Sequence, residues 1–278
     1  SSNVNLFGSI DKSCSGLIEL PASEKFGLLW MSPEPDVVLD VEHLLGAIGP
    51  ELEGWGLQDH VLCGEKALRK NMNWKLANDT FGENYHFPVL HRNTLSSLFR
   101  GDVMSYEKFG LNHRFVFPGR KISDLKKKPK RKWRLDGVAT ILYYLFPNVQ
   151  LATSERQTTL FRIYPVKGDP RRSVTMVSHY FSSDALDLIS SGEKTVIDAS
   201  NTYEEKARDS NAIVSPEAAM EIIDSTVEQE DFKMAEASQV SADSGLIKNF
   251  IFGRNEAPLH HFHSSFRSEL GLSPLEEP

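Results

Sequence analysis

The distribution of apolar residues at the start of the chain predicts short elements. Residues 16–32 indicate two short apolar strands around a polar turn at Ala22–Lys25. Residues 37–52 predict a short helix that stops at a Gly-Pro pair. A further helix is expected from about Trp74 to His86, because the preceding asparagine can cap it and Pro88 would end or kink it.

The middle of the chain is rich in β-branched and aromatic residues, which favour strands. Four stretches have this character: 111–119, 138–154, 157–168 and 172–183. Residues typical of turns, among them Pro118 with Gly119 and Gly168 with Asp169, separate the stretches. Short connections of this kind favour an antiparallel meander.

Two long helices are predicted after these strands, over 193–211 and 215–241, from their length and charge content. Ser215, Pro216 and Glu217 form a start signal for the second helix, with serine at the cap and proline in the first turn. The order of short strands, a helix, a meander and long helices implies an α+β domain. We expect a central antiparallel sheet with the long helices packed on one face.

The composition of the 278 residues narrows the class of protein. Hydrophobic residues make up 40% and charged residues 25%, which is ordinary for a globular chain. The net charge of −7 does not suit a nucleic-acid-binding protein. No apolar run approaches the ~20 residues that span a bilayer, and no secretory signal is visible, so a cytoplasmic location without membrane contact is expected. The basic run at 125–134 is expected to be a solvated loop rather than a phosphate- or partner-binding patch.

The two cysteines, Cys14 and Cys63, do not form a CxxC zinc pattern. One disulfide between them and a reduced pair are both open, and the reduced pair is the favoured interpretation. The chain begins with Ser-Ser instead of Met, so we expect a segment upstream of the printed sequence.

One segment, GENYHFPVLHRNTL, contains candidate chemistry because His86 and His91 lie five residues apart. On spacing alone two ordinary histidines are the default, since H-x4-H is far less specific than HExxH. A bend at Pro88 would let His91 swing back toward His86. The nearby carboxylates of Asp79 and Glu83 are the kind of group that orients a metal-bound imidazole.

A late acid, Asp231, is the candidate third ligand. It shares a predicted helix face with Val227, Met234, Ala235 and Ser238, so it would point inward and need a cation. Glu228 lies near the same stripe, so periodicity does not decide between the two acids. Two neutral histidines and one carboxylate form the facial triad of non-haem Fe(II) oxygenases, although such a triad also binds other divalent metals.

Four stretches of the chain resemble segments of the Rieske-type ring-hydroxylating oxygenases. NWKLANDTFGENYHFPVLH is similar to their iron-binding segment, which has NWK, an acidic position and then [DE]-x-x-H-x4-H. EDFKMAEASQ is similar to a later segment in which an acid precedes Glu by five residues and Gln by eight, and Asp231, Glu236 and Gln239 fit that spacing. GLIELPASEKFGLLWMSPEPD resembles the stretch that joins the two domains, and YYLFPNVQLATS resembles a sheet strand.

The resemblance is to the catalytic, C-terminal domain of the alpha subunit. It implies a helix-grip (START/Bet v1-like) domain over 37–278, with 1–36 as the remnant of interdomain strands. His86, His91 and Asp231 match the ligands of a mononuclear Fe(II). The position of Glu83 matches the carboxylate that connects this iron to a Rieske histidine in the neighbouring subunit.

Two carboxylates have further interpretations. Glu83 can also be a capping or surface residue, and many ring dioxygenases have Asp at its position. Some relatives that act on quaternary ammonium compounds also have Glu, so the substrate class stays open. Asp79 is expected either to hold a ligand histidine from behind or to be a solvated helix residue.

A [2Fe–2S] Rieske cluster needs two cysteines and two histidines, in the family as C-x-H and C-x2-H. Neither Cys14 nor Cys63 is followed by histidine at these spacings. We therefore expect the cluster on an upstream domain, on another chain, or lost, and the isolated domain to be inactive. The resemblance also implies O₂, a small aromatic substrate that is hydroxylated or oxidatively demethylated, a ferredoxin or reductase, and a homotrimer, alone or with beta subunits.

Two other functions stay open. The cavity of a helix-grip domain can hold a hydrophobic ligand without catalysis, and the same triad with zinc would suit a hydrolase, although no separate general base is evident.

The remaining aromatic and histidine residues are expected to be structural. Tyr85 is predicted to be a packed core residue, with the orientation of an iron-bound group as the alternative, and Trp74 to contribute packing. The run HHFH at 260–263 is expected to be surface or C-terminal helix histidines. His113 and His179 lie on predicted strands and could face the cavity, although a hydrogen-bonded core histidine is the default interpretation.

Overall fold

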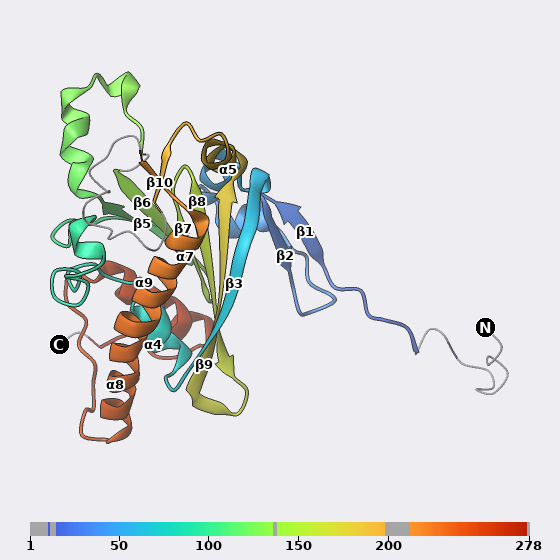
Figure 1. Cartoon of the computed structure of the whole chain (residues 1–278). Helices are drawn as coiled ribbons and strands as arrows, with labels where there is room; N and C mark the ends of the chain where they lie inside the picture. The colour runs from blue at the N-terminus through green and yellow to red at the C-terminus, as the bar shows by residue number, and fades with distance from the viewer. Residues whose placement is uncertain (1–10, 12–14, 136–137, 198–211, 277–278) are drawn as a thin grey trace.

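The computed structural model describes residue 11 and residues 15–135, 138–197 and 212–276 (Figure 1). Its centre is a seven-stranded sheet in the order β3-β9-β8-β7-β6-β5-β4, in which every neighbouring pair is antiparallel. The strands are β3 (His60–Lys70), β4 (Ser105–Phe109), β5 (Asn112–Pro118), β6 (Ala139–Leu145), β7 (Val149–Thr153), β8 (Gln157–Val166) and β9 (Asp169–Ser182). The predicted meander is confirmed as β5 to β9, and 138–154 forms a hairpin of two strands.

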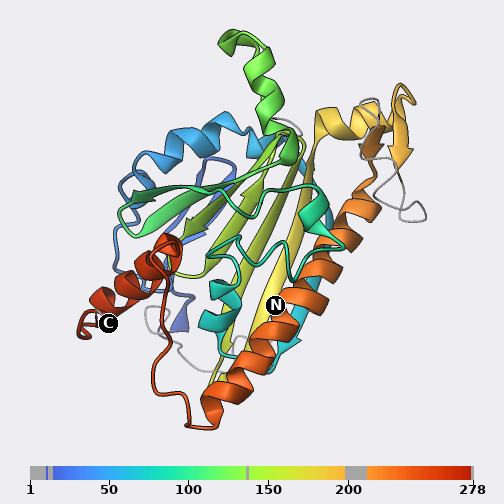
Figure 2. The ribbon, with the colours of Figure 1, turned by 90° about the vertical axis from the view of Figure 1, so that its left-hand side faces the viewer.

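One continuous helical rod crosses one face of the sheet. It consists of α7 (Pro216–Thr226), a π-helical turn η6 (Val227–Asp231) and α8 (Phe232–Asp243). The Ser215 hydroxyl accepts from the amide of Ala218 and Pro216 occupies the first turn, so the predicted start is confirmed. Figure 2 shows this rod in front of the strands, with α4 (Trp74–Asp79) and α9 (Ala257–Glu269) on the same side.

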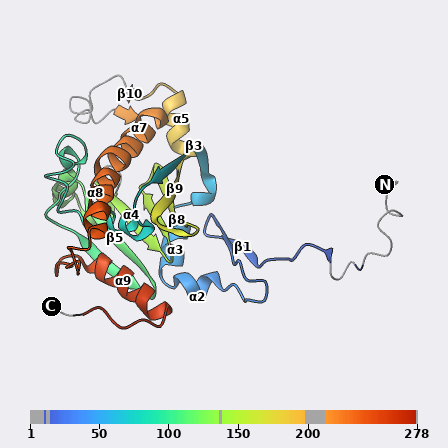
Figure 3. The ribbon, with the colours of Figure 1, turned by 90° about the horizontal axis from the view of Figure 1, so that it is seen from below.

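The opposite face of the sheet is covered by α2 (Val41–Leu45), α3 (Ile48–Gly54) and the hairpin of β1 (Ala22–Lys25) and β2 (Leu28–Met31). Residues 15–21, which precede β1, extend away from this body (Figure 3). The long helices thus lie on one face as predicted, but the sheet is not open on the other. Proline fits the first turn of a helix, so the Gly-Pro pair lies inside α3 and does not end a helix.

Alternation along the strands builds a separate core on each face. Tyr143 and Leu160 pack in the cluster under α2 and α3, whereas the adjacent Phe161 packs in the cluster under the helical rod. The next residue along β6, Tyr144, contacts the ring of Phe262 on α9. Because both of its faces are buried, β6 (ATILYYL) is a nearly continuous apolar run.

Several predicted boundaries differ from the structure. Residues Ala22–Lys25 form a strand, and the turn is at Phe26 and Gly27, which both have positive φ as a two-residue hairpin requires. The helix expected over 74–86 ends at Asp79.

Of the helix expected over 193–211, Thr195–Ile197 instead forms β10, which pairs in parallel with β11 (Ala212–Val214). Residues 198–211 lie outside the described residues, as does Cys14, and Cys63 is a free thiol.

Four short 3₁₀ helices and one α-helix complete the described fold. They are η2 (Leu57–Asp59), η3 (Leu95–Ser97), η4 (Arg120–Lys127), η5 (Lys130–Lys132) and α5 (Ser183–Ser190). The basic run at 125–134, predicted as a loop, thus contains two short 3₁₀ segments. Among the described helices, none has the length and apolar content to cross a bilayer.

Candidate metal centre

The segment after α4 carries the two candidate histidines back toward each other. Asn73 caps α4 through its side-chain oxygen, which accepts from the amide of Lys75 at 2.9 Å. After α4 ends, the chain turns at Pro88, where the amides of Leu90 and His91 donate to the carbonyls of His86 and Phe87 at 2.8 and 3.1 Å. This turn brings His91 beside His86, as the bend at Pro88 was expected to do.

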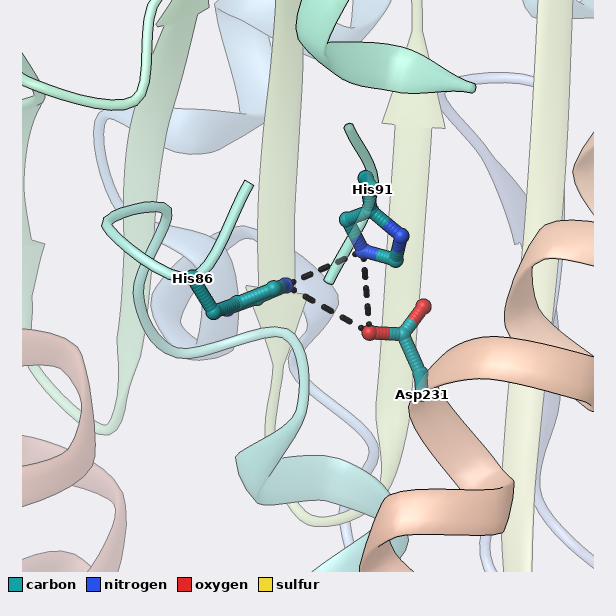
Figure 4. Close-up of side chains that lie close together, drawn as sticks. All are labelled: His86, His91 and Asp231. Carbon is teal, nitrogen blue, oxygen red and sulfur yellow. Dashed lines mark hydrogen bonds and ion pairs between the residues drawn. The ribbon is translucent and has the colours of Figure 1, made fainter. Parts of the chain in front are cut away.

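Three ligand-type atoms from two distant segments converge at this point (Figure 4). His86 Nε2 lies 3.1 Å from His91 Nε2, and the Asp231 Oδ1 atom lies 3.4 Å from the first and 3.1 Å from the second. Ligand atoms that each bind one ion at about 2.1 Å stand roughly 3.0 to 3.4 Å apart in octahedral or tetrahedral geometry. The residues present therefore fit one small divalent cation.

A carboxylate occupies the outer nitrogen of each ring. His86 Nδ1 is hydrogen-bonded to Glu83 Oε1, and His91 Nδ1 lies 2.5 Å from Glu230 Oε2. Thr94 also donates to Glu230 Oε2, at 2.9 Å. A carboxylate at Nδ1 keeps the proton there and leaves the Nε2 lone pair free, which is how metal-binding histidines are generally held.

The electrostatics of this cluster favour positive charge. Burial lowers the pKa of His86, but hydrogen bonds with Asp231 and Glu83 outweigh it and raise that pKa to about 9. For His91 burial also acts downward, and the hydrogen bond and charge of Asp231 raise its pKa overall. With neutral imidazoles, three carboxylates in contact with two rings carry three negative charges, which a divalent cation would largely offset.

The helical rod supplies the acid through its π-helical turn. Asp231 is the last residue of η6 and is buried, and the next residue, Phe232, is fully buried in the core. Glu228 instead forms ion pairs with Lys66 and Lys70 at 2.8 and 3.1 Å. Of the two acids that periodicity left open, the structure therefore brings Asp231 to the histidines.

Asp79 is not where the sequence suggested. Its carboxylate lies 2.8 Å from His263 Nε2 on α9, and the outer nitrogens of His86 and His91 are taken by Glu83 and Glu230. Burial raises the pKa of Asp79, and the contact with His263 acts in the opposite direction. The helix α4 ends at Asp79, so Asp79 and His86 do not lie on one helix face. The side chain of Asp79 instead contacts α9.

Other residues singled out from the sequence have structural surroundings. Trp74 packs edge-on against Phe262 and Phe266, as predicted. The core prediction for Tyr85 is wrong: its side chain is half exposed, and its hydroxyl donates to Glu256 Oε1 at 2.6 Å.

The remaining histidines lie away from the three converging atoms. Residues 260–263 lie in α9, and His261 is buried with its Nδ1 2.9 Å from Nδ1 of His113. His179 is buried between Thr159 and Asp224, as expected of a core histidine.

Glu230 is the site residue that the sequence analysis missed. It lies in a run of three acids within four residues, and helical periodicity alone cannot assign adjacent acids to one site. The carboxylates of Asp79 and Glu83 already supplied two candidate orienting groups for the two histidines, so the sequence carried no signal that called for Glu230.

We expect Glu230→Gln to weaken divalent metal binding by about 10- to 100-fold, because an amide orients the His91 ring less firmly and adds no basicity. Isothermal titration with Co(II) measures the change. Glu221→Gln, on the exposed side of α7, is the matched control and should bind as the parent does. Equal affinity in Glu230→Gln and the parent would contradict this role.

Comparison with known protein families gives one match. The family model described as ring hydroxylating alpha subunit (catalytic domain) matches residues 57–271, well over half of the chain. A search of curated protein sequences gives no match.

Solved structures with a similar fold include quaternary ammonium Rieske monooxygenases. One, reported for carnitine oxidation by gut microbiota and inter-subunit electron transfer, has 14% identity and a TM-score of 0.68 over 97% of this chain and 66% of that chain. Another, CntA in complex with L-carnitine, has 16% identity and a TM-score of 0.63 over 98% and 65%. The chain thus spans about two thirds of these structures. At such identities the likeness establishes the fold, and the predicted α+β helix-grip architecture is confirmed.

Proposed function

The chain belongs to the family of ring-hydroxylating alpha subunits, whose catalytic domain it matches, and from this premise we propose that it is the oxygenase half of a Rieske-type enzyme. It would use one mononuclear Fe(II) and O₂ to hydroxylate or oxidatively demethylate a small organic molecule. The family description, ring hydroxylating, favours an aromatic substrate. A quaternary ammonium substrate is the alternative, because some relatives that act on such compounds also have Glu at the position of Glu83.

One observation carries this proposal. Two imidazoles and a carboxylate, from segments 140 residues apart, bring one atom each within 4.8 Å of one another in a mostly buried place. Buried polar groups at such spacing are stable only with a shared proton or a cation between them. Two histidines and one acid leave positions open on an octahedral ion, which suits oxygen chemistry better than a closed structural site.

The roles of the protein side chains follow from their contacts. His86 and His91 would hold the iron through Nε2, Asp231 would supply the anionic ligand, and Glu230 would fix the ring of His91. When bound, the iron supplies the redox chemistry with O₂ and substrate. The chain contributes the protonation state of both rings, because a proton held at each Nδ1 keeps Nε2 free.

Glu83 has a second proposed role at the subunit boundary. It holds His86 twice, with Oε1 at Nδ1 and with Oε2 accepting from the backbone amide at 3.2 Å. We propose that it also meets a histidine of the Rieske cluster of a neighbouring subunit and so connects the electron source with the iron ligand. The cluster, a ferredoxin or reductase donor and a trimeric assembly belong to this proposal. None of the required Cys-His spacings occurs in the printed sequence.

Anaerobic titration with Fe(II) tests the proposal directly. We expect about one iron per chain, bound by the parent and lost in His86→Ala, because removal of one of three ligands leaves only two. Nitric oxide, an O₂ analogue, should then give the electron paramagnetic resonance signal of a ferrous nitrosyl in the parent, which reports open positions on the iron.

His43→Ala, which changes an exposed histidine on α2, is the matched control and should retain both properties. Iron binding by His86→Ala equal to that of the parent would rule out the proposed site. Cleavage of an ester with zinc and without a reductant would indicate the alternative function of a zinc hydrolase. Binding of an apolar ligand without iron would indicate a non-catalytic ligand-binding domain.

A further inference from the structure

A groove of about 560 Å³ lies between α9 and the turn that joins β4 to β5, separate from the candidate metal residues. Seven polar or charged residues line it: Lys108, Arg254, His260, His261, Ser264, Ser265 and Ser268. Figure 3 shows α9 running beside β5 at this side of the molecule. The volume is large enough for a small organic molecule and not only for a single ion.

The groove is lined on one side by a continuous polar face of α9. Residues 257, 260, 261, 264, 265 and 268 recur at intervals of three or four, so they share one side of the helix. The other side of α9 carries Phe262 and Phe266, which pack against Trp74 and toward the core. A polar face beside a hollow of this size is suited to a polar ligand.

The positive charges of the groove are not compensated. Among the described residues, the side chains of Lys108 and Arg254 take part in no ion pair or hydrogen bond, and no acid belongs to the lining. The charged lining of the groove is therefore positive, although the chain as a whole has a net charge of −7. Guanidinium and ammonium groups together favour oxyanions, and guanidinium can contact phosphate with two parallel hydrogen bonds.

The serine hydroxyls of this face also remain available. Ser190, Ser238 and Ser241 in other helices donate to the carbonyl four residues earlier, at 2.9, 3.1 and 3.3 Å. None of the three groove serines makes such a bond within the described part of the chain. Ser265 is more than nine-tenths buried and yet lines the groove without a partner there. The Ser265 hydroxyl makes no hydrogen bond to the described residues, so it is available to an oxygen atom of a ligand in the groove.

We propose that this groove is a binding site for a phosphate group, free or carried by a small organic molecule. Arg254 and Lys108 supply the charge, and the hydroxyls of Ser264, Ser265 and Ser268 donate to the remaining oxygens. No covalent step is involved. The proposal depends on no part of the iron chemistry, because none of the lining residues belongs to the candidate metal centre.

Isothermal titration of the full chain with inorganic phosphate and with adenosine monophosphate tests the site, with adenosine as the ligand that lacks the oxyanion. We expect saturable binding of phosphate or adenosine monophosphate that falls about tenfold or more in Arg254→Gln and in Lys108→Gln. Ser265→Ala should weaken it less. Lys130→Gln removes one charge from the exposed η5 and is the matched control, with binding unchanged.

The variants at 108 and 254 change exposed side chains, so they should fold as the parent does, and their thermal unfolding checks this. Three results would overturn the proposal: no saturable binding of either phosphate ligand at about 10 mM, an equal loss in Lys130→Gln, or binding of adenosine as tight as that of its monophosphate.

Discussion

Asp231→Ala should lower the affinity of the chain for Fe(II) or Co(II) by more than about a hundredfold. Groups that only orient a ligand are worth about 10- to 100-fold in metal affinity, and Asp231 offers an atom to the ion itself. It is also the only one of the three ligand-type groups that is an anion, so its loss removes the charge that offsets a divalent cation. Titration under anaerobic conditions, or the visible spectrum of bound Co(II), measures the effect.

Glu228→Ala is the matched control for this experiment. Glu228 lies three residues earlier on the same helical rod, but its carboxylate pairs with Lys66 and Lys70 at the sheet edge. Ion pairs that reach solvent contribute about 0–1 kcal/mol to stability, so this variant should fold and bind metal as the parent does. Loss of metal in the Glu228 variant together with retention in the Asp231 variant would reverse our assignment of the acid.

Phe232→Ala should lower the free energy of unfolding by about 3–5 kcal/mol. Phe232 is fully buried beneath the helical rod and belongs to the core cluster with Leu68, Phe161 and Val177. Two effects contribute to this loss. The substitution removes the favourable free energy of burying the ring, and it leaves a cavity between the rod and the sheet. Equilibrium unfolding in guanidinium chloride measures the change, provided that the transition is two-state.

Phe250→Ala gives the comparison for this stability experiment. The Phe250 ring is half exposed, so the same substitution should change the free energy of unfolding by no more than about 0.5 kcal/mol. A Phe232 variant as stable as the Phe250 variant would mean that the rod does not depend on this core for its position.

The sequence was informative wherever one local signal decided the structure. Ser215 and Pro216 marked the start of the rod, and β-branched stretches with short connections predicted the meander from β5 to β9. The sequence also predicted that His86 and His91 lie close together, because the bend at Pro88 between them is a local property of proline.

Other features depended on distant parts of the chain. β3 was not predicted, because it forms an edge of the sheet by pairing with β9, about a hundred residues later in the sequence. β4 was also missed, although it pairs with β5 through a two-residue turn, because its five residues are mostly polar or charged and carry no strong strand pattern. The partner of Asp79 is His263, 184 residues away, and no periodicity connects the two. Asp231 and Glu228 could not be separated, because regular helical spacing does not account for the π-helical turn between α7 and α8.

That turn has a consequence for how such a site can arise. Buried or half-buried positions recur every four residues along the rod, at 219, 223, 227, 231, 235 and 239. In a regular α-helix each such step overshoots a full turn by about 40°, so the row would spiral away from the sheet. The wider turn acts as an inserted residue that resets the phase, and its last member is the acid. Deleting one residue there would restore an ordinary helix whose two halves still face the sheet, but without the wide turn that ends at Asp231. The insertion or deletion of one residue can thus decide whether such a helix presents a metal ligand or only covers a sheet.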